Sequence, residues 1–174
     1  MKDLRYPIGR FSPPGEPLTP QLRSQMIDEI EQAPAAVRAA VQAVGVQNLD
    51  TPYRPGGWTV AQVVHHLPDS HLNAYIRFKL ALTEDEPEIK TYDQEAWAQL
   101  ADGASPPIEM SLLLLESLHE RWVRLLRSLQ PEAFRRSLKH PEWGTIDLDT
   151  LLSIYAWHGK HHTAHIYQAG EGKS

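Results

Sequence analysis

The sequence predicts an all-α protein, a four-helix bundle, from its helical patterning, its capping residues and its length. Four long segments place apolar residues three and four positions apart, which is the spacing of one buried helix face. Threonines in capping positions open the first two of these segments. The 174 residues fit a single domain, 1–174, that can bury a sizeable core. Packing four such helices together is the economical way to bury their apolar faces.

Residues 1–18 are expected to form an extended arm before the first helix. This segment holds four prolines and two glycines, which interrupt regular structure. Its larger apolar side chains, Tyr6, Ile8 and Phe11, favour an arm that packs on the body of the protein. A disordered tail is the alternative.

The first helix is predicted over 20–44. Thr19 suits the N-cap, and Pro20 suits the first helical position, where a missing N–H costs nothing. Gly45 suits the position just after the last turn. Pro34 lies inside the segment and is expected to kink or break the helix.

The second helix is predicted to begin after Thr59 and to run to about Leu82. Thr59 and Gln62 have the spacing of a capping box, in which each side chain bonds the main-chain N–H of the other residue. Pro68 lies inside this segment as well, and we expect a kink there.

Short extra elements and two more long helices complete the predicted fold. Residues 93–101 resemble a short helix, and a longer helix with a wide stripe of leucines is expected over 105–129. Residues 143–145 have the composition of a tight turn, so a small hairpin fits there. The last helix is expected over 151–169.

The composition excludes several classes of protein. The chain has no cysteine, which rules out disulfides, thiolate metal sites and a cysteine nucleophile. A net charge of −5 and a pI near 6.0 give no basic surface, so we expect no nucleic-acid partner. No apolar stretch approaches the roughly 20 residues that cross a membrane, and the start lacks the apolar core of a secretory signal. A cytoplasmic location without membrane attachment is therefore expected.

Histidine is the residue type that points to chemistry. Seven of the nine histidines fall into two windows: His65, His66 and His71, then His158, His161, His162 and His165. In the last helix, His158 and His162 lie on the apolar stripe and are one turn apart, so both rings face the interior. Two such imidazoles can bind one metal ion, which would satisfy both nitrogens at once. The alternative is a pair of hydrogen-bonded core histidines.

The early window offers a third ligand, but periodicity does not choose it. His65, His66 and His71 project in different directions from one helix. His71 shares a face with Val60 and Phe78, which favours it, although the angle beyond Pro68 is unreliable. A catalytic zinc site usually has three protein ligands and an open position.

Three segments resemble the DinB/YfiT family of bacterial metal-binding proteins. They are LRYPIG near the amino terminus, the stretch TPYRPGGWTVAQVVHHLPDSHLNAYIRFKLAL from Thr51, and IYAWHGKHHTAHI from Ile154. The resemblance covers nearly the whole chain. It implies that the first metal ligand is the histidine eight residues after Trp58, which is His66. It also implies that His158 and His162 are the other two ligands, in agreement with the helical periodicity.

The resemblance further implies an up-down-down-up bundle that is often a homodimer. Members are described as metal-dependent hydrolases of small molecules, and relatives act as bacillithiol S-transferases. The expected cofactor is one divalent ion, Zn²⁺ or Ni²⁺, because three neutral nitrogens suit either and disfavour calcium and magnesium. The leading expectation is thus a hydrolase, with transfer of a low-molecular-weight thiol as the alternative. There are two non-enzymatic alternatives. One is a metal-binding stress module without turnover, and the other is a scaffold with core histidines.

Other residues near the predicted site are expected to have secondary roles. Asp69, three residues after His66, is a candidate for orienting a ligand, and His165 is a candidate for orientation or proton transfer. Gln62 is expected to cap its helix rather than line the site. His119 and His140 lie outside both windows and are expected at the surface.

Overall fold

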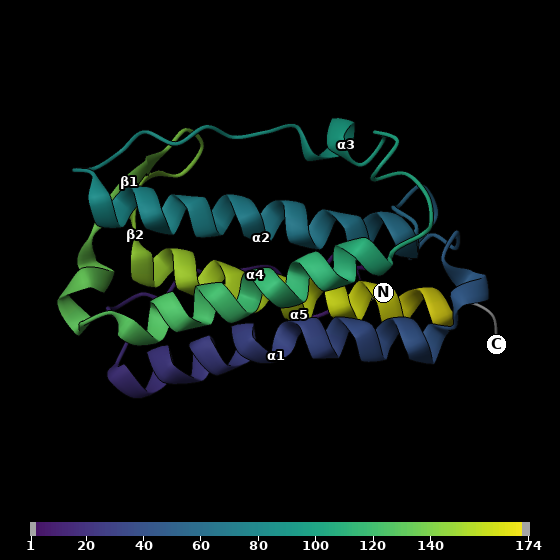
Figure 1. Ribbon diagram of the computed structural model, residues 1–174, viewed down its shortest axis with the longest axis horizontal. Helices are drawn as coiled ribbons and strands as arrows, with labels where there is room; N and C mark the ends of the chain where they lie inside the picture. Colours follow the sequence, from purple (N-terminus) through teal and green to yellow (C-terminus); the bar gives the residue numbers. More distant parts are fainter. Residues whose placement is uncertain (1–2, 172–174) are drawn as a thin grey trace.

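A computed structural model describes residues 3–171 as four long helices with a small hairpin at one end (Figure 1). The long helices are α1 (Pro20–Val44), α2 (Val60–Thr83), α4 (Glu109–Ser128) and α5 (Leu148–Glu171). The short elements are η1 (Val46–Asn48), α3 (Gln94–Trp97), η2 (Pro131–Arg135), β1 (Ser137–His140) and β2 (Gly144–Asp147). The all-α class is confirmed, and the two antiparallel strands form the expected hairpin.

The chain follows an up-down-down-up course. In Figure 1, α1 and α5 run in one direction, whereas α2 and α4 run in the other. Helix α1 packs against α5 and α4, and α2 packs against the same two helices, so α1 and α2 lie diagonally across the bundle. Because α2 and α4 are parallel, the connection 84–108 must travel the length of the bundle, and it carries α3 along the outside of α2.

Both predicted helix starts are confirmed by their caps. The Thr19 hydroxyl accepts a hydrogen bond from the Leu22 N–H at the start of α1. The capping box is complete at the start of α2, where Thr59 accepts from the Gln62 N–H and Gln62 accepts from the Thr59 N–H. These bonds satisfy donors that the first helical turn leaves free.

The structure corrects the predicted start of α4 and shows that α1 and α2 continue through their inner prolines. Helix α4 begins at Glu109 rather than at Ser105, because two consecutive prolines, Pro106 and Pro107, disfavour helical backbone before them. Neither Pro34 nor Pro68 ends its helix, since α1 and α2 continue through them. Each of these helices buries one face over its whole length, and that packing holds the helix across a missing hydrogen bond.

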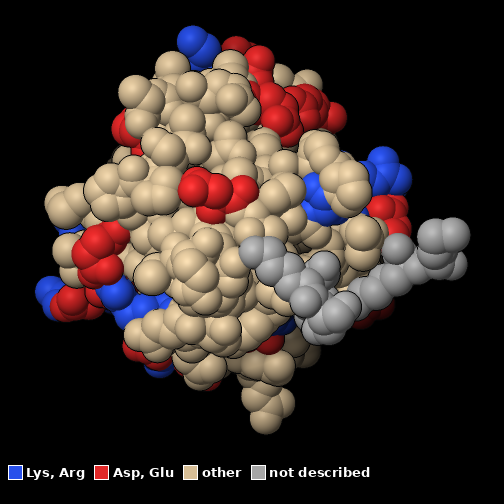
Figure 2. All heavy atoms as spheres, turned by 90° about the vertical axis from the view of Figure 1, so that its right-hand side faces the viewer, with Lys and Arg blue, Asp and Glu red and all other residues tan. Residues whose placement is uncertain are grey.

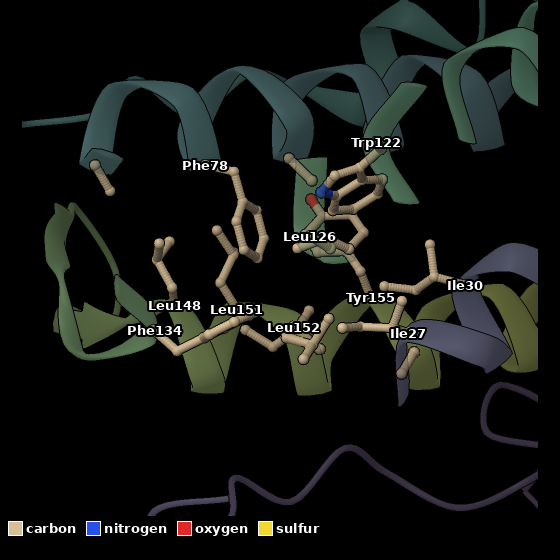
Figure 3. Packing of buried hydrophobic residues seen from close by; sticks show 14 of the residues in the cluster. Ile27, Ile30, Phe78, Trp122, Leu126, Phe134, Leu148, Leu151, Leu152 and Tyr155 are labelled. Atoms are coloured by element: carbon tan, nitrogen blue, oxygen red, sulfur yellow. The ribbon is translucent and has the colours of Figure 1, made fainter. Parts of the chain in front are cut away.

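The core lies along the bundle axis, between the four long helices. Figure 3 shows Phe78 of α2 and Trp122 of α4 pointing at each other above side chains of α5 and α1. The Phe78 and Trp122 rings make an edge-to-face contact with centroids 5.6 Å apart, and both are fully buried. A second apolar cluster fills the other half of the bundle. The site described below lies among the helices between these clusters.

The extended arm packs on the body, as the sequence favoured. The Phe11 ring contacts the Trp157 ring, and the Tyr6 ring contacts the His161 ring, each with centroids 6.0 Å apart. The Leu4 carbonyl accepts a hydrogen bond from the side-chain amide of Gln168. The arm is therefore anchored on α5, beside the histidines of that helix.

The face of the molecule shown in Figure 2 carries both acidic and basic side chains. They are scattered and separated by uncharged areas. Among the described residues, no helix combines the length and apolarity needed to cross a membrane.

Candidate metal centre

Three histidines from two distant segments meet inside the bundle. His66 of α2 and His158 and His162 of α5 each offer one ring nitrogen, and these nitrogens all lie within 4.8 Å of one another. The Nε2 atoms of His66 and His158 are 3.4 Å apart. Two nitrogens bound to one zinc ion at roughly 2.0–2.1 Å lie about 3.4 Å apart in tetrahedral geometry. The donor set therefore fits a divalent transition-metal ion.

The three rings are neutral, which leaves lone pairs available to a metal. Burial lowers the pKa of His66 to about 4. Burial, and then the neighbouring imidazoles, hold the pKa values of His158 and His162 well below the ordinary value. Metal binding requires neutral imidazole, so at neutral pH no proton has to leave these rings before an ion binds.

A chain of hydrogen bonds through two further histidines sets the orientation of His158. The Ile30 carbonyl of α1 lies 2.6 Å from His119 Nδ1, His119 Nε2 lies 2.7 Å from His71 Nδ1, and His71 Nε2 lies 3.0 Å from His158 Nδ1. A carbonyl only accepts, so His119 carries its proton on Nδ1. His119 Nε2 then accepts from His71, and His71 accepts from His158. This order places the His158 proton on Nδ1 and leaves its Nε2 lone pair facing His66.

Pro34 explains why the Ile30 carbonyl is available at the end of this chain. In an α-helix that oxygen would accept the N–H of the residue four positions later. That residue is Pro34, which has no N–H. The side chain of His119 donates to the carbonyl in its place.

A second, shorter chain orients His162 in the same way. The Arg5 carbonyl of the arm lies 3.2 Å from His165 Nε2, and His165 Nδ1 lies 3.3 Å from His162 Nδ1. The carbonyl fixes the His165 proton on Nε2, so His165 Nδ1 accepts from His162 Nδ1. His162 then also keeps its Nε2 lone pair free. Both ligand candidates on α5 are thus held by another histidine and a main-chain oxygen.

The site opens to the surface beside the arm. A cavity of about 330 Å³ is lined by His158 and His162, by Trp58 and by the arginines Arg5 and Arg54. The Trp58 ring lies 4.7 Å from the His66 ring, and its Nε1 donates to the Glu95 carboxylate at 2.8 Å. His158 also lines a second cavity of about 480 Å³. A small molecule can therefore approach the rings of His158 and His162.

Comparison with known proteins identifies the family of this chain. The sequence profile of the DinB superfamily matches residues 29–166. The chain belongs to the DinB superfamily.

Other DinB superfamily members are similar along almost their whole length. Proteins of Bacillus mycoides and Bacillus cereus, both named "Putative metal-dependent hydrolase", are 52% and 53% identical over 166 residues, which is 95% of each chain. The solved structure of YfiT from Bacillus subtilis, reported as a probable metal-dependent hydrolase with an unusual four-helix bundle topology, has a TM-score of 0.92. It is 45% identical and the match covers 97% of both chains.

The hydrogen-bond chain from Ile30 to His158 predicts how a remote residue of this DinB bundle affects the candidate metal ligands. Replacing His119 with Phe keeps a buried ring but removes the acceptor for the His71 proton. We expect metal affinity to fall about 10–100-fold, because His158 is no longer held in one tautomer. Competition with a chromogenic chelator measures the affinity, and ¹⁵N shifts of the histidine rings in metal-free protein report the tautomer of His158. His65→Phe is the matched control. Unchanged tautomer and affinity in His119→Phe would contradict the assignment.

The structure places the remaining predicted residues of this DinB superfamily member as follows. His65 faces away from the three rings, with Nδ1 2.7 Å from the Ser111 hydroxyl. His71 lies behind His158 instead of beside it. Asp69 is half-buried, with a pKa raised by burial and by Asp102, and in residues 3–171 its carboxylate makes no hydrogen bond to the three rings. Gln62 caps α2 and donates to the Ala98 carbonyl.

The expectation that His119 and His140 lie at the surface was wrong. Their side chains are buried, with 2% and 7% exposure. His119 lies four residues after Leu115 and three before Trp122, so the apolar stripe of α4 already contained the signal for its burial. His140 stacks on Trp143 across the hairpin, with ring centroids 4.5 Å apart. That contact depends on the turn between the strands, which no helical period reveals.

Proposed function

We propose that this protein is a metal-dependent hydrolase that holds one Zn²⁺ or Ni²⁺ ion through His66, His158 and His162. The observation that supports this is the convergence of three neutral imidazoles, two of which are held with Nε2 free. A zinc ion held by three protein ligands keeps a position open and activates water as a nucleophile near neutral pH. Carboxylic esters and amides are the substrates that this chemistry suits.

The side chains around the ligands have separate roles in this proposal. His71 and His119 keep the proton of His158 on Nδ1, and His165 does the same for His162. Both nitrogens of His165 are engaged, so it orients a ligand and does not accept protons from substrate. Among the described residues, no hydrogen bond joins the Asp69 carboxylate to the three rings, so we propose no metal-orienting role for it. Trp58 shields the ring of His66 from water.

Transfer of a low-molecular-weight thiol is the second candidate function. The chain has no cysteine, so no thiol of the protein competes with a substrate thiol for the ion. A divalent zinc or nickel ion favours the thiolate, which is the nucleophilic form. Arg54 at the opening suits an anionic thiol, whereas Arg5 is already paired with Asp3 and Glu95 lines the same cavity.

One experiment separates these functions. Untagged protein would be purified, its metal content measured, and turnover followed with ester and amide substrates and with a thiol plus a bimane electrophile. We expect close to one metal per chain and ester hydrolysis that a chelator abolishes and added zinc restores. Thiol transfer without hydrolysis would select the second function. Bound metal without either turnover would indicate a non-catalytic metal module, and turnover that survives chelation would refute both enzymes.

The assembly and location are part of the proposal. We infer a cytoplasmic homodimer from the family resemblance and from the cysteine-free composition, which fits a reducing compartment. Light scattering on purified protein measures the mass in solution, and a monomeric mass would refute the dimer.

A further inference from the structure

Arg77 of α2 is a buried cation that forms no ion pair with the residues that the structure describes. Its exposed fraction is 8%, and one guanidinium nitrogen donates to the Lys90 carbonyl at 3.1 Å. No carboxylate within residues 3–171 forms an ion pair with it. A guanidinium keeps its charge at every physiological pH. Burying such a charge unpaired is unfavourable, so its retention beside a cavity needs a reason.

Further hydrogen-bond donors surround Arg77 on one wall of the 480 Å³ cavity. The wall includes the hydroxyl groups of Ser70, Tyr92 and Tyr155. The Tyr155 phenol interacts with Ser70 and with Arg77, and the Tyr92 phenol interacts with Ser70. Burial raises the pKa of Tyr92 to about 12 and raises that of Tyr155 as well, so both phenols keep their protons at neutral pH. The wall therefore presents one fixed positive charge and neutral O–H groups.

The acidic residues of the cavity do not neutralise this charge. The Asp93 carboxylate accepts a hydrogen bond from the Ala96 N–H as the cap of α3. Glu142 is exposed on the hairpin turn and lies near His140. The pKa of His140 is lowered by burial and then by the charge of Arg77, and the opposing effect of Glu142 is smaller. The charge of Arg77 therefore acts on His140, which lines the same cavity.

We propose that Arg77, together with the hydroxyls of Tyr92, Tyr155 and Ser70, binds an oxyanion group, a carboxylate or a phosphate, of the substrate. His158 lines the same cavity, so an anion held there lies next to the three-histidine centre. The other walls include Phe11, Trp143 and Trp157, which suit an apolar body for that molecule. Assigning the anion to the substrate rests on the proposed function, whereas the anion site itself does not.

Titration of metal-free protein with acetate and with inorganic phosphate tests the site without any turnover. Backbone and arginine Nε ¹⁵N resonances would be followed at constant ionic strength, with chloride replaced by the probe. We expect saturable shifts at Arg77 and Tyr155, and the tighter of the two probes distinguishes a carboxylate site from a phosphate site. Absence of saturable shifts with both anions would overturn the proposal. Absence of hydrolysis in the earlier experiment would leave this result untouched.

Variants decide whether Arg77 binds the anion or only supports the fold. Arg77→Met should weaken binding by about tenfold or more, because a charge-assisted hydrogen bond is lost. Arg77→Lys should bind with intermediate affinity, and Arg124→Met, which removes an exposed charge on α4, should bind as the parent does. Without anion, Arg77→Met should melt no lower than the parent, because an unpaired buried charge has gone. Arg77 would have a structural role instead if Arg77→Met melts well below the parent and Arg77→Lys binds the anion as tightly as the parent does. If Arg77→Met does not fold, the anion affinity of Arg77→Lys and the titration of the Arg77 Nε resonance in the parent still show whether Arg77 binds the anion.

Discussion

His66→Ala is expected to abolish metal binding at the proposed site while the bundle stays folded. Among the described residues, the ring supplies one of three converging nitrogens, and its Nε2 is the atom that faces His158 Nε2 at 3.4 Å. Loss of a direct ligand should lower metal affinity more than about 100-fold, beyond the effect of losing an orienting partner. Metal analysis after dialysis and competition with a chromogenic chelator measure the loss. Turnover in the assays proposed above should disappear with the metal.

His65→Ala is the matched control for this substitution. The two histidines are neighbours in the sequence and both are buried, but His65 bonds to Ser111 of α4 and to the Ser105 carbonyl. Its removal should leave metal affinity unchanged and cost stability alone. Equal metal binding by His66→Ala and the parent protein would remove His66 from the site and reopen the choice among the early histidines.

Asp149→Ala is expected to destabilise the fold by about 3–5 kcal/mol, because it leaves a buried cation unpaired. Asp149 of α5 forms a two-pronged ion pair with Arg23 of α1, with both N–O distances at 2.7 Å. The side chains are only 5% and 11% exposed. The Arg23 guanidinium also lies over the Phe134 ring. Urea unfolding followed by circular dichroism measures the change in the free energy of unfolding.

Two further variants show that the cost comes from the unpaired charge. The double variant Arg23→Met with Asp149→Leu removes both charges and should recover most of the lost stability. Arg127→Ala breaks exposed ion pairs with Asp28 and Glu31 and should cost no more than about 1 kcal/mol. If Asp149→Ala costs no more than Arg127→Ala, the buried pair contributes little to holding α1 on α5.

Local chemistry made much of the fold predictable. The caps at Thr19 and Thr59 act over three residues, and the apolar stripes of the long helices repeat every turn, so sequence spacing encodes both. The two prolines were harder to interpret. Their local cost favours a kink or a break, but burial of a whole helix face, visible only in the assembled bundle, holds the helix together at Pro34 and Pro68.

The candidate site was predictable where one helix contains it and not where several helices build it. His158 and His162 follow from one period on one helix, and the structure brings both to His66, which the family resemblance selected. The contacts of His119 with His71 and with Ile30 join three helices, so no spacing within one segment could predict them. The lack of an ion pair at Arg77 among the described residues could not be predicted either, because it depends on where the carboxylates lie in the assembled fold.

Pro34 links the backbone of one helix to proton placement in another. By withholding an amide, it leaves an oxygen of α1 open to a donor from α4, and the order of protons then passes through His71 to His158 on α5. Residue 34 thereby influences a ring on another helix. An ordinary amide at this position would compete with His119 for the same oxygen, so an otherwise conservative change in an outlying helix would blur the choice of nitrogen that His158 presents.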